Sequence, residues 1–166
     1  MLSFTESQLR DAFVNASKGE AKRAALPDLA AVDFDALDYL GWQDPKRPRQ
    51  YYVALDLDGE PAVLLLRGPE NPPAKKLLCA WCEDIIDGVH AASFVAPLAG
   101  ESGRRGNTVG TAICADFRCS RNVRREPSSF ELRTEDPALL AYHREQKIQG
   151  LRERSTGFVR SVLARS

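Results

Sequence analysis

The sequence is poor in the residues that mark membrane spans and catalytic sites. Its apolar runs are short, such as Ala62–Leu66, whereas a helix that crosses a bilayer needs roughly 20 residues. Neither of its two histidines, His90 and His143, lies in a recognisable catalytic or metal-binding motif. The glycine-rich stretch 100–108 lacks the lysine and the glycine spacing of a phosphate-binding loop. We therefore expect neither a membrane-spanning protein nor an enzyme that uses one of the common motifs.

A secretory signal is also missing from the sequence. Residues 1–11 contain no basic start followed by an apolar core, so we expect a cytoplasmic protein in a reducing compartment. With 166 residues, 43 % of them hydrophobic and 28 % charged, the chain has the composition of an ordinary globular protein. It is long enough for one hydrophobic core and a small metal-binding module.

The four cysteines of the chain are arranged in two pairs. Cys79 and Cys82 are separated by two residues, Cys114 and Cys119 by four, and 31 residues lie between the pairs. Two short turns of this kind can each present two thiolates to one tetrahedral zinc ion. The sequence thus predicts one structural Zn²⁺ per chain, and a shell of four thiolates leaves no open position for catalysis.

Two alternatives to a four-cysteine shell stay open at this point. The cysteines could form disulfides, which the expected reducing compartment disfavours. His90, eight residues after Cys82, could replace one cysteine as a ligand, because imidazole is also a good ligand for zinc.

Positive charge is concentrated near the cysteines, although the formal net charge of the chain is zero. Residues 102–125 carry six arginines against the single acid Asp116. Arginine has a forked shape that suits phosphate and carboxylate groups, and such a patch attracts anionic surfaces. A solvated charged face would look the same, so charge alone names no partner. The arginines are Arg104, Arg105, Arg118, Arg121, Arg124 and Arg125.

The first 70 residues are expected to fold as helices followed by a hairpin. Thr5 and Gln8 have the spacing of a capping box at the start of a helix, and Asp58-Gly59 is a turn dipeptide between two strand-like runs. Helices are predicted over 6–17, 19–25 and 29–41, and strands over 51–57 and 62–67.

The remaining residues are expected to form a metal module and a helical tail. Residues 68–73, with three prolines and a glycine, are the predicted linker. A first cysteine turn, strands over 93–98 and 108–113, and a helix from Ser120 follow in the order of a treble clef. Residues 136–164 are predicted to form either one helix or two helices separated at Gly150 or Gly157.

The predicted fold class is accordingly α+β, with N-terminal helices and a β-hairpin, then a treble-clef zinc-finger module, then a C-terminal helix. Three parts are expected: an N-terminal α+β region of unknown role at 1–70, the zinc module at 75–130, and a helical segment at 131–166 that packs on the rest.

Residues 75–130 resemble a known family. The resemblance lies in Cys79-x2-Cys82, Ser93-Phe94-Val95, Gly110-Thr111-Ala112-Ile113-Cys114 and Cys119-Ser120-Arg121-Asn122-Val123. These segments are similar to the C-terminal treble-clef zinc finger, the elongation factor G-binding (FBP) domain, of FusB-type fusidic-acid-resistance proteins. The resemblance implies a protein that docks on elongation factor G and helps to release it from the ribosome. It also implies that the zinc ion keeps the docking surface in shape.

Partner contacts are expected from the six arginines and from aromatic anchors. Family members often carry an aromatic residue where this chain has Ala112, so Trp81, Phe94 and Phe117 are the candidate anchors. The alternative is an RNA- or ribosome-binding zinc finger with no elongation factor as client. In that case the arginines would contact phosphates and an aromatic ring would stack on a base.

Overall fold

The structure is a computed structural model that describes residues 1–71, 77–84 and 90–164. Its centre is a five-stranded antiparallel sheet in which the strands follow one another in chain order. The strands are β1 Tyr39–Gln43, β2 Gln50–Leu57, β3 Glu60–Arg67, β4 Ala91–Pro97 and β5 Thr108–Cys114. The helices are α1 Glu6–Asp11, α2 Lys18–Arg23, α3 Gly100–Arg104, α4 Cys119–Asn122 and α5 Pro137–Leu163.

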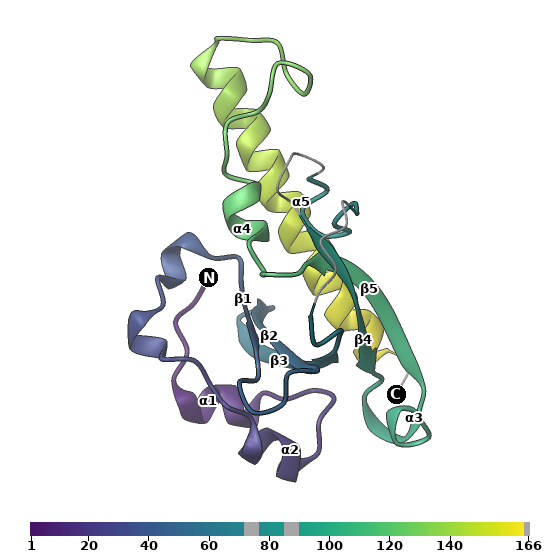
Figure 1. Cartoon of the computed structure of the whole chain (residues 1–166). Coiled ribbons are helices and arrows are strands. Elements are labelled where there is room, and N and C mark those ends of the chain that lie inside the picture. The colour runs from purple at the N-terminus through teal and green to yellow at the C-terminus, as the bar shows by residue number, and fades with distance from the viewer. Residues whose placement is uncertain (72–76, 85–89, 165–166) are drawn as a thin grey trace.

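The sheet is covered on both faces, as Figure 1 shows for the helices around it. Side chains of β2 alternate between two hydrophobic clusters because successive strand residues point to opposite faces. Tyr51 and Val53 belong to the cluster that contains the cysteines and the apolar residues of α5. Tyr52 and Ala54 belong to the cluster formed with the N-terminal segments. The metal module and α5 thus share one core with the middle of the sheet.

The hairpin of β2 and β3 is confirmed. Asp58 and Gly59 have φ values of 58° and 91°, the left-handed conformation that a two-residue hairpin turn of this type requires. The capping box at Thr5 and Gln8 is confirmed as well. The helix that follows, however, ends at Asp11 instead of residue 17. Beyond it, Phe13 forms a parallel bridge with Val63, so pairing with β3 replaces further helical hydrogen bonds.

The predicted helix over 29–41 is wrong. Two short 3₁₀ turns, η1 Leu29–Ala31 and η2 Phe34–Ala36, precede β1, which begins at Tyr39. Strand β1 pairs along its whole length with β2, from Tyr39 opposite Leu55 to Gln43 opposite Tyr51. The apolar spacing of this segment also fits a helix, but pairing with β2 satisfies its backbone hydrogen-bonding groups as an edge strand.

The C-terminal helix α5 is continuous, so the prediction of one helix is confirmed and the alternative with a break at Gly150 or Gly157 is not. A glycine inside a helix costs about 1 kcal/mol relative to alanine. Here the buried side chains of Leu151, Val159 and Val162 pack on the sheet and offset that cost. Among the described residues no helix is long and apolar enough to cross a membrane.

The boundary expected between the N-terminal region and the zinc module falls inside the sheet. Arg67 of β3 pairs with Val95 of β4, so strands from both sides of the boundary are neighbours. Part of the predicted linker, residues 72 and 73, lies outside the described residues.

Candidate metal centre

The structure brings the four cysteines together from three local elements. Cys79 and Cys82 flank a tight turn whose Ala80 amide donates to the carbonyl of Ala112 in β5. Cys114 is the last residue of β5, and Cys119 is the first residue of α4. A first cysteine turn, a β-hairpin and a helix that starts on a ligand make up the predicted treble clef.

The geometry of the sulfurs suits a zinc ion. All four sulfurs lie within 4.8 Å of one another, and all four cysteines are buried. The Cys79 and Cys119 sulfurs are 3.5 Å apart, and those of Cys82 and Cys114 are 3.6 Å apart. Four thiolates on a tetrahedral zinc ion lie about 3.8 Å from one another, whereas a disulfide requires about 2.05 Å. The cluster therefore fits a metal shell and not a pair of disulfides.

The ionisation of the four thiols also requires a metal cation. Hydrogen bonds from Cys114, Cys119 and Cys82 lower the pKa of the Cys79 thiol, whereas contacts with Cys119, Cys79 and Cys82 raise the pKa of Cys114. Sulfurs crowded in this way cannot all ionise unless a cation balances their charge. A zinc ion supplies that charge, and its binding energy then contributes to folding. His90 is exposed and is not part of the cluster.

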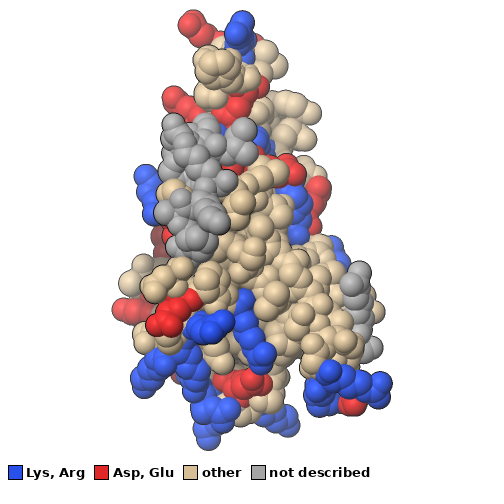
Figure 2. All heavy atoms as spheres, turned by 45° about the vertical axis from the view of Figure 1, so that its right-hand side comes forward, with Lys and Arg blue, Asp and Glu red and all other residues tan. Residues whose placement is uncertain are grey.

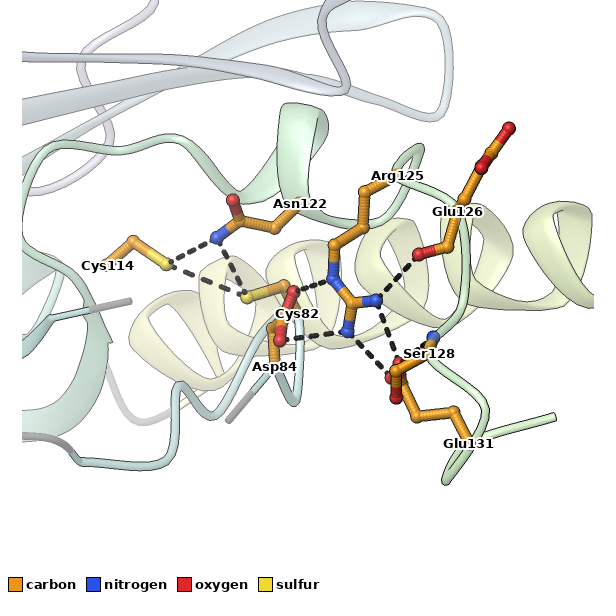
Figure 3. A network of polar contacts seen from close by, with 8 residues as sticks. All are labelled: Cys82, Asp84, Cys114, Asn122, Arg125, Glu126, Ser128 and Glu131. Atoms are coloured by element: carbon orange, nitrogen blue, oxygen red, sulfur yellow. Dashed lines mark hydrogen bonds and ion pairs between the residues drawn. The ribbon is translucent and has the colours of Figure 1, made fainter. Parts of the chain in front are cut away.

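Two further side chains face the sulfurs, and the sequence had singled out neither as part of the site. The Asn122 side-chain amide lies 3.4 Å from the Cys114 sulfur and 3.8 Å from that of Cys82. Figure 3 shows it directed at both. Tyr39 is 1 % exposed, and burial followed by the charge of Cys119 raises the pKa of its hydroxyl well above the usual value. Asn122 belongs to the sequence motif around the second cysteine pair. Tyr39 lies 40 residues before Cys79, the nearest cysteine, so no local sequence pattern connects it with the site.

An ion-pair network braces the first cysteine turn against the chain after α4. Arg125 bonds Asp84, two residues beyond Cys82, and also Glu131 (Figure 3). Hydrogen bonds from Arg125 lower the pKa of Glu131 to about 2. Although Arg125 was predicted to contact a partner, its side chain is 26 % exposed and is occupied by these two carboxylates. Its observed contacts are internal.

A second network anchors α4 to β1 and α5. The carboxylate of Asp38 is fully buried and accepts hydrogen bonds from Arg124 and Arg152, the latter at 2.8 Å. The backbone amide of Asp38 donates to the Ser120 hydroxyl at 2.9 Å. The helix that carries Cys119 is thereby held in place by residues from both ends of the chain.

The six arginines predicted as one patch lie in two places. Arg104 and Arg105 belong to α3 or its end and pair with Glu101, far from α4 in Figure 1. Figure 2 shows Lys and Arg side chains gathered at the lower end of one face, whose middle is largely uncharged. At α4, Arg118 pairs with Asp116, whereas Arg121 is exposed and has no ion pair within the described structure.

The aromatic anchors expected from the sequence are buried. Trp81 is 2 % exposed and packs edge-on against Tyr39, and Phe94 is fully enclosed between β-strands and rings. Phe117 is 9 % exposed and contacts Phe94 and Tyr51. Small cores are often dominated by such rings. Their position does not support a role for Trp81 or Phe94 as exposed contacts.

A groove of about 690 Å³ lies beside α4. Its floor is apolar and includes Leu37, Leu40 and Phe117, and Arg118 and Arg121 stand among its lining residues. In this groove the structure joins a predicted aromatic residue, Phe117, to the predicted arginines Arg118 and Arg121.

These features define a treble-clef zinc-finger protein with a single four-cysteine metal centre. The model of the family described as "FBP C-terminal treble-clef zinc-finger" matches residues 8–162, so the chain belongs to that family. A search of curated proteins found no match.

Among solved structures, the chain is similar to the fusidic acid resistance protein FusC, with a TM-score of 0.57 and 21 % sequence identity. The similarity covers 74 % of this chain and 53 % of FusC, so the chain spans about half the length of that relative. At this identity the comparison concerns the fold.

Proposed function

We propose that this protein binds translation elongation factor G in the cytoplasm and promotes its release from the ribosome, with fusidic-acid resistance as the consequence. The observation that carries the proposal is the family match over residues 8–162, together with a four-cysteine centre that suits the zinc ion of a zinc finger. The similarity to FusC, a fusidic acid resistance protein, supports it at the level of the fold.

The groove beside α4 is the surface that we propose for docking. Its apolar floor at Leu37, Leu40 and Phe117 can take an apolar side chain of the partner. Arg121 at its edge is exposed and is not engaged by a carboxylate within the part of the chain that the structure describes. Because α4 begins with the ligand Cys119, zinc binding fixes the helix that carries Arg121.

Binding, and not catalysis, is the activity that the site supports. Four thiolates close the coordination shell of zinc and leave no position for a water molecule or a substrate. We therefore propose a structural role for the ion, which is to keep the groove in shape.

The arginine pairing does not favour the RNA alternative. Five of the six arginines predicted to contact a partner already bond carboxylates of this chain. These are Arg104, Arg105, Arg118, Arg124 and Arg125. A phosphate backbone would have to compete with each of these pairs.

Titration calorimetry against elongation factor G from the same organism tests the proposal. We expect binding by the zinc-loaded protein and roughly five- to tenfold weaker binding by Arg121→Glu, because a charge at the edge of an interface contributes on the order of 1 kcal/mol. Arg49→Glu is the matched control, since Arg49 is exposed and does not line the groove. It should bind like the parent protein.

Absence of detectable binding at tens of micromolar protein, with zinc bound and the fold intact, would contradict the proposal. Binding to RNA that weakens steeply with salt would then favour the alternative, because phosphate contacts release counterions. Equal effects of Arg121→Glu and Arg49→Glu would leave elongation factor G as partner but place the interface away from the groove.

A further inference from the structure

The four sulfurs of the metal centre are surrounded by hydrogen-bond donors from different parts of the chain. Asn122, the last residue of α4, directs its amide at the Cys114 and Cys82 sulfurs, at 3.4 and 3.8 Å. The backbone amide of Cys82 donates to the Cys79 sulfur at 3.4 Å. Three of the four sulfurs, those of Cys79, Cys82 and Cys114, thus have a donor. Figure 3 shows the two that Asn122 contacts.

The candidate donor for the fourth sulfur, that of Cys119, is Tyr39 in the first strand of the sheet. The hydroxyl of Tyr39 in β1 is buried and has no hydrogen-bond partner in the described structure. A buried hydroxyl without a partner costs about 1–3 kcal/mol, so its position requires an explanation. Tyr39 belongs to the same buried cluster as the four cysteines, and the amide of the preceding Asp38 donates to the hydroxyl of Ser120, the residue next to Cys119. Once zinc is bound, Cys119 is a thiolate and can accept the Tyr39 proton as a hydrogen bond.

We propose that Asn122 and Tyr39 are positioning residues that complete a set of one donor per sulfur and make the zinc thiolates unreactive. Four thiolates and one Zn²⁺ leave two negative charges in a buried site. Donors aimed at the sulfurs delocalise this charge, hold the ligands in place and lower their nucleophilicity. The short helix α4 therefore supplies one ligand, Cys119, and also the donor for two others.

The two residues protect different sulfurs, and this separates the proposal from a general effect on stability. Without the Asn122 amide, the thiolates of Cys82 and Cys114 should lose their hydrogen-bond donor and become the most reactive sulfurs. Without the Tyr39 hydroxyl, the thiolate of Cys119 should become the most reactive sulfur. A variant that merely loosens the fold would make all four cysteines react together.

The test compares Asn122→Leu, Tyr39→Phe and the control Asn107→Leu in the zinc-loaded, full-length protein. Asn107 donates its amide to the Ser102 hydroxyl in an exposed loop and touches no sulfur. Each protein is treated with iodoacetamide, whose carbon bonds to the attacking sulfur as iodide leaves, and the modified cysteines are mapped by mass spectrometry. Zinc affinity is measured in parallel by competition with a chelator.

We expect Asn122→Leu to bind zinc about 10- to 100-fold more weakly and to be alkylated first at Cys82 and Cys114. Tyr39→Phe should be alkylated first at Cys119, and Asn107→Leu should match the parent protein.

Tyr39→Phe keeps the test decisive even if Asn122→Leu fails to fold, because it removes only one oxygen atom. If the hydroxyl has no partner in the zinc-bound protein, its removal should raise the melting temperature. A higher melting temperature for Tyr39→Phe, or the same alkylation order in every variant, would overturn the proposal.

Discussion

Gly41 of β1 is the position at which the smallest change should disturb the metal centre. A Cβ atom added there would lie 2.7 Å from the Cβ of Phe117 and would overlap its ring. Phe117 cannot readily withdraw. Its backbone lies in the left-handed region at φ 57°, between the ligands Cys114 and Cys119, and its ring packs on Phe94.

Overpacking of a filled core costs about 1–3 kcal/mol, and we expect Gly41→Ala to lie in the upper half of that range because Phe117 has little freedom. For a chain of this size, 2–3 kcal/mol corresponds to a melting temperature lower by about 4–12 °C. Thermal unfolding of the zinc-loaded protein measures this directly. Chelator competition should show weaker zinc binding as well, since any shift of Phe117 moves the turn between two ligands.

Two controls make the result interpretable. Gly157→Ala adds the same methyl group to α5, where no heavy atom lies within 4 Å, and should raise stability by about 0.5–1 kcal/mol. Combining Gly41→Ala with Phe117→Gly should cost no more than Phe117→Gly alone, because glycine at 117 removes both the ring and the Cβ atom that the new methyl group would overlap. Additive costs in the double variant, or a Gly41→Ala protein as stable as its parent, would show that Phe117 does not crowd position 41.

Three more predictions concern the ion-pair networks. Asp38→Ala should lower the free energy of unfolding by about 3 kcal/mol in urea titrations, because it strips Arg124 of its buried partner; a loss below about 1 kcal/mol would count against the anchoring role. Arg125→Gln should cost about 2 kcal/mol, whereas Arg160→Gln, which breaks the exposed pair with Asp58, should cost less than about 1 kcal/mol; equal losses would contradict the brace. For Glu131, hydrogen bonds from Arg125 lower the folded-state pKa from 4.5 to about 2. Its contribution is therefore complete above about pH 4.5 and disappears as the pH falls toward 2. The stability difference between the parent and Glu131→Gln should shrink over that window, and a difference that stays constant with pH would exclude the assignment.

Local signals in the sequence predicted the parts of the fold that depend on neighbouring residues. The capping box at Thr5, the Asp58-Gly59 turn and the spacing of the cysteines each act over a few residues, so they could be read without the tertiary structure. The strand at Tyr39–Gln43 could not, because its apolar spacing also fits a helix and only pairing with β2 decides between them.

Contacts between distant segments account for what the sequence did not indicate at the site. The arginines near the cysteines look like one patch in the sequence, but Arg125 meets Asp84 from 41 residues away and Arg124 meets Asp38 from 86 residues away. The sequence suggests Trp81 as a surface anchor because no local pattern shows that α5 covers it. In the structure its ring contacts Phe158 of α5. Exposure is a property of the assembled fold.

One zinc ion, held by Cys79, Cys82, Cys114 and Cys119, supports the treble clef. Elemental analysis combined with native mass spectrometry, on protein purified without chelator, tests it most directly. We predict one zinc per chain in the parent protein. We also predict loss of the metal and of the module's fold in Cys114→Ser, because the binding energy of the metal is also folding energy. A folded protein that carries no zinc would contradict the claim.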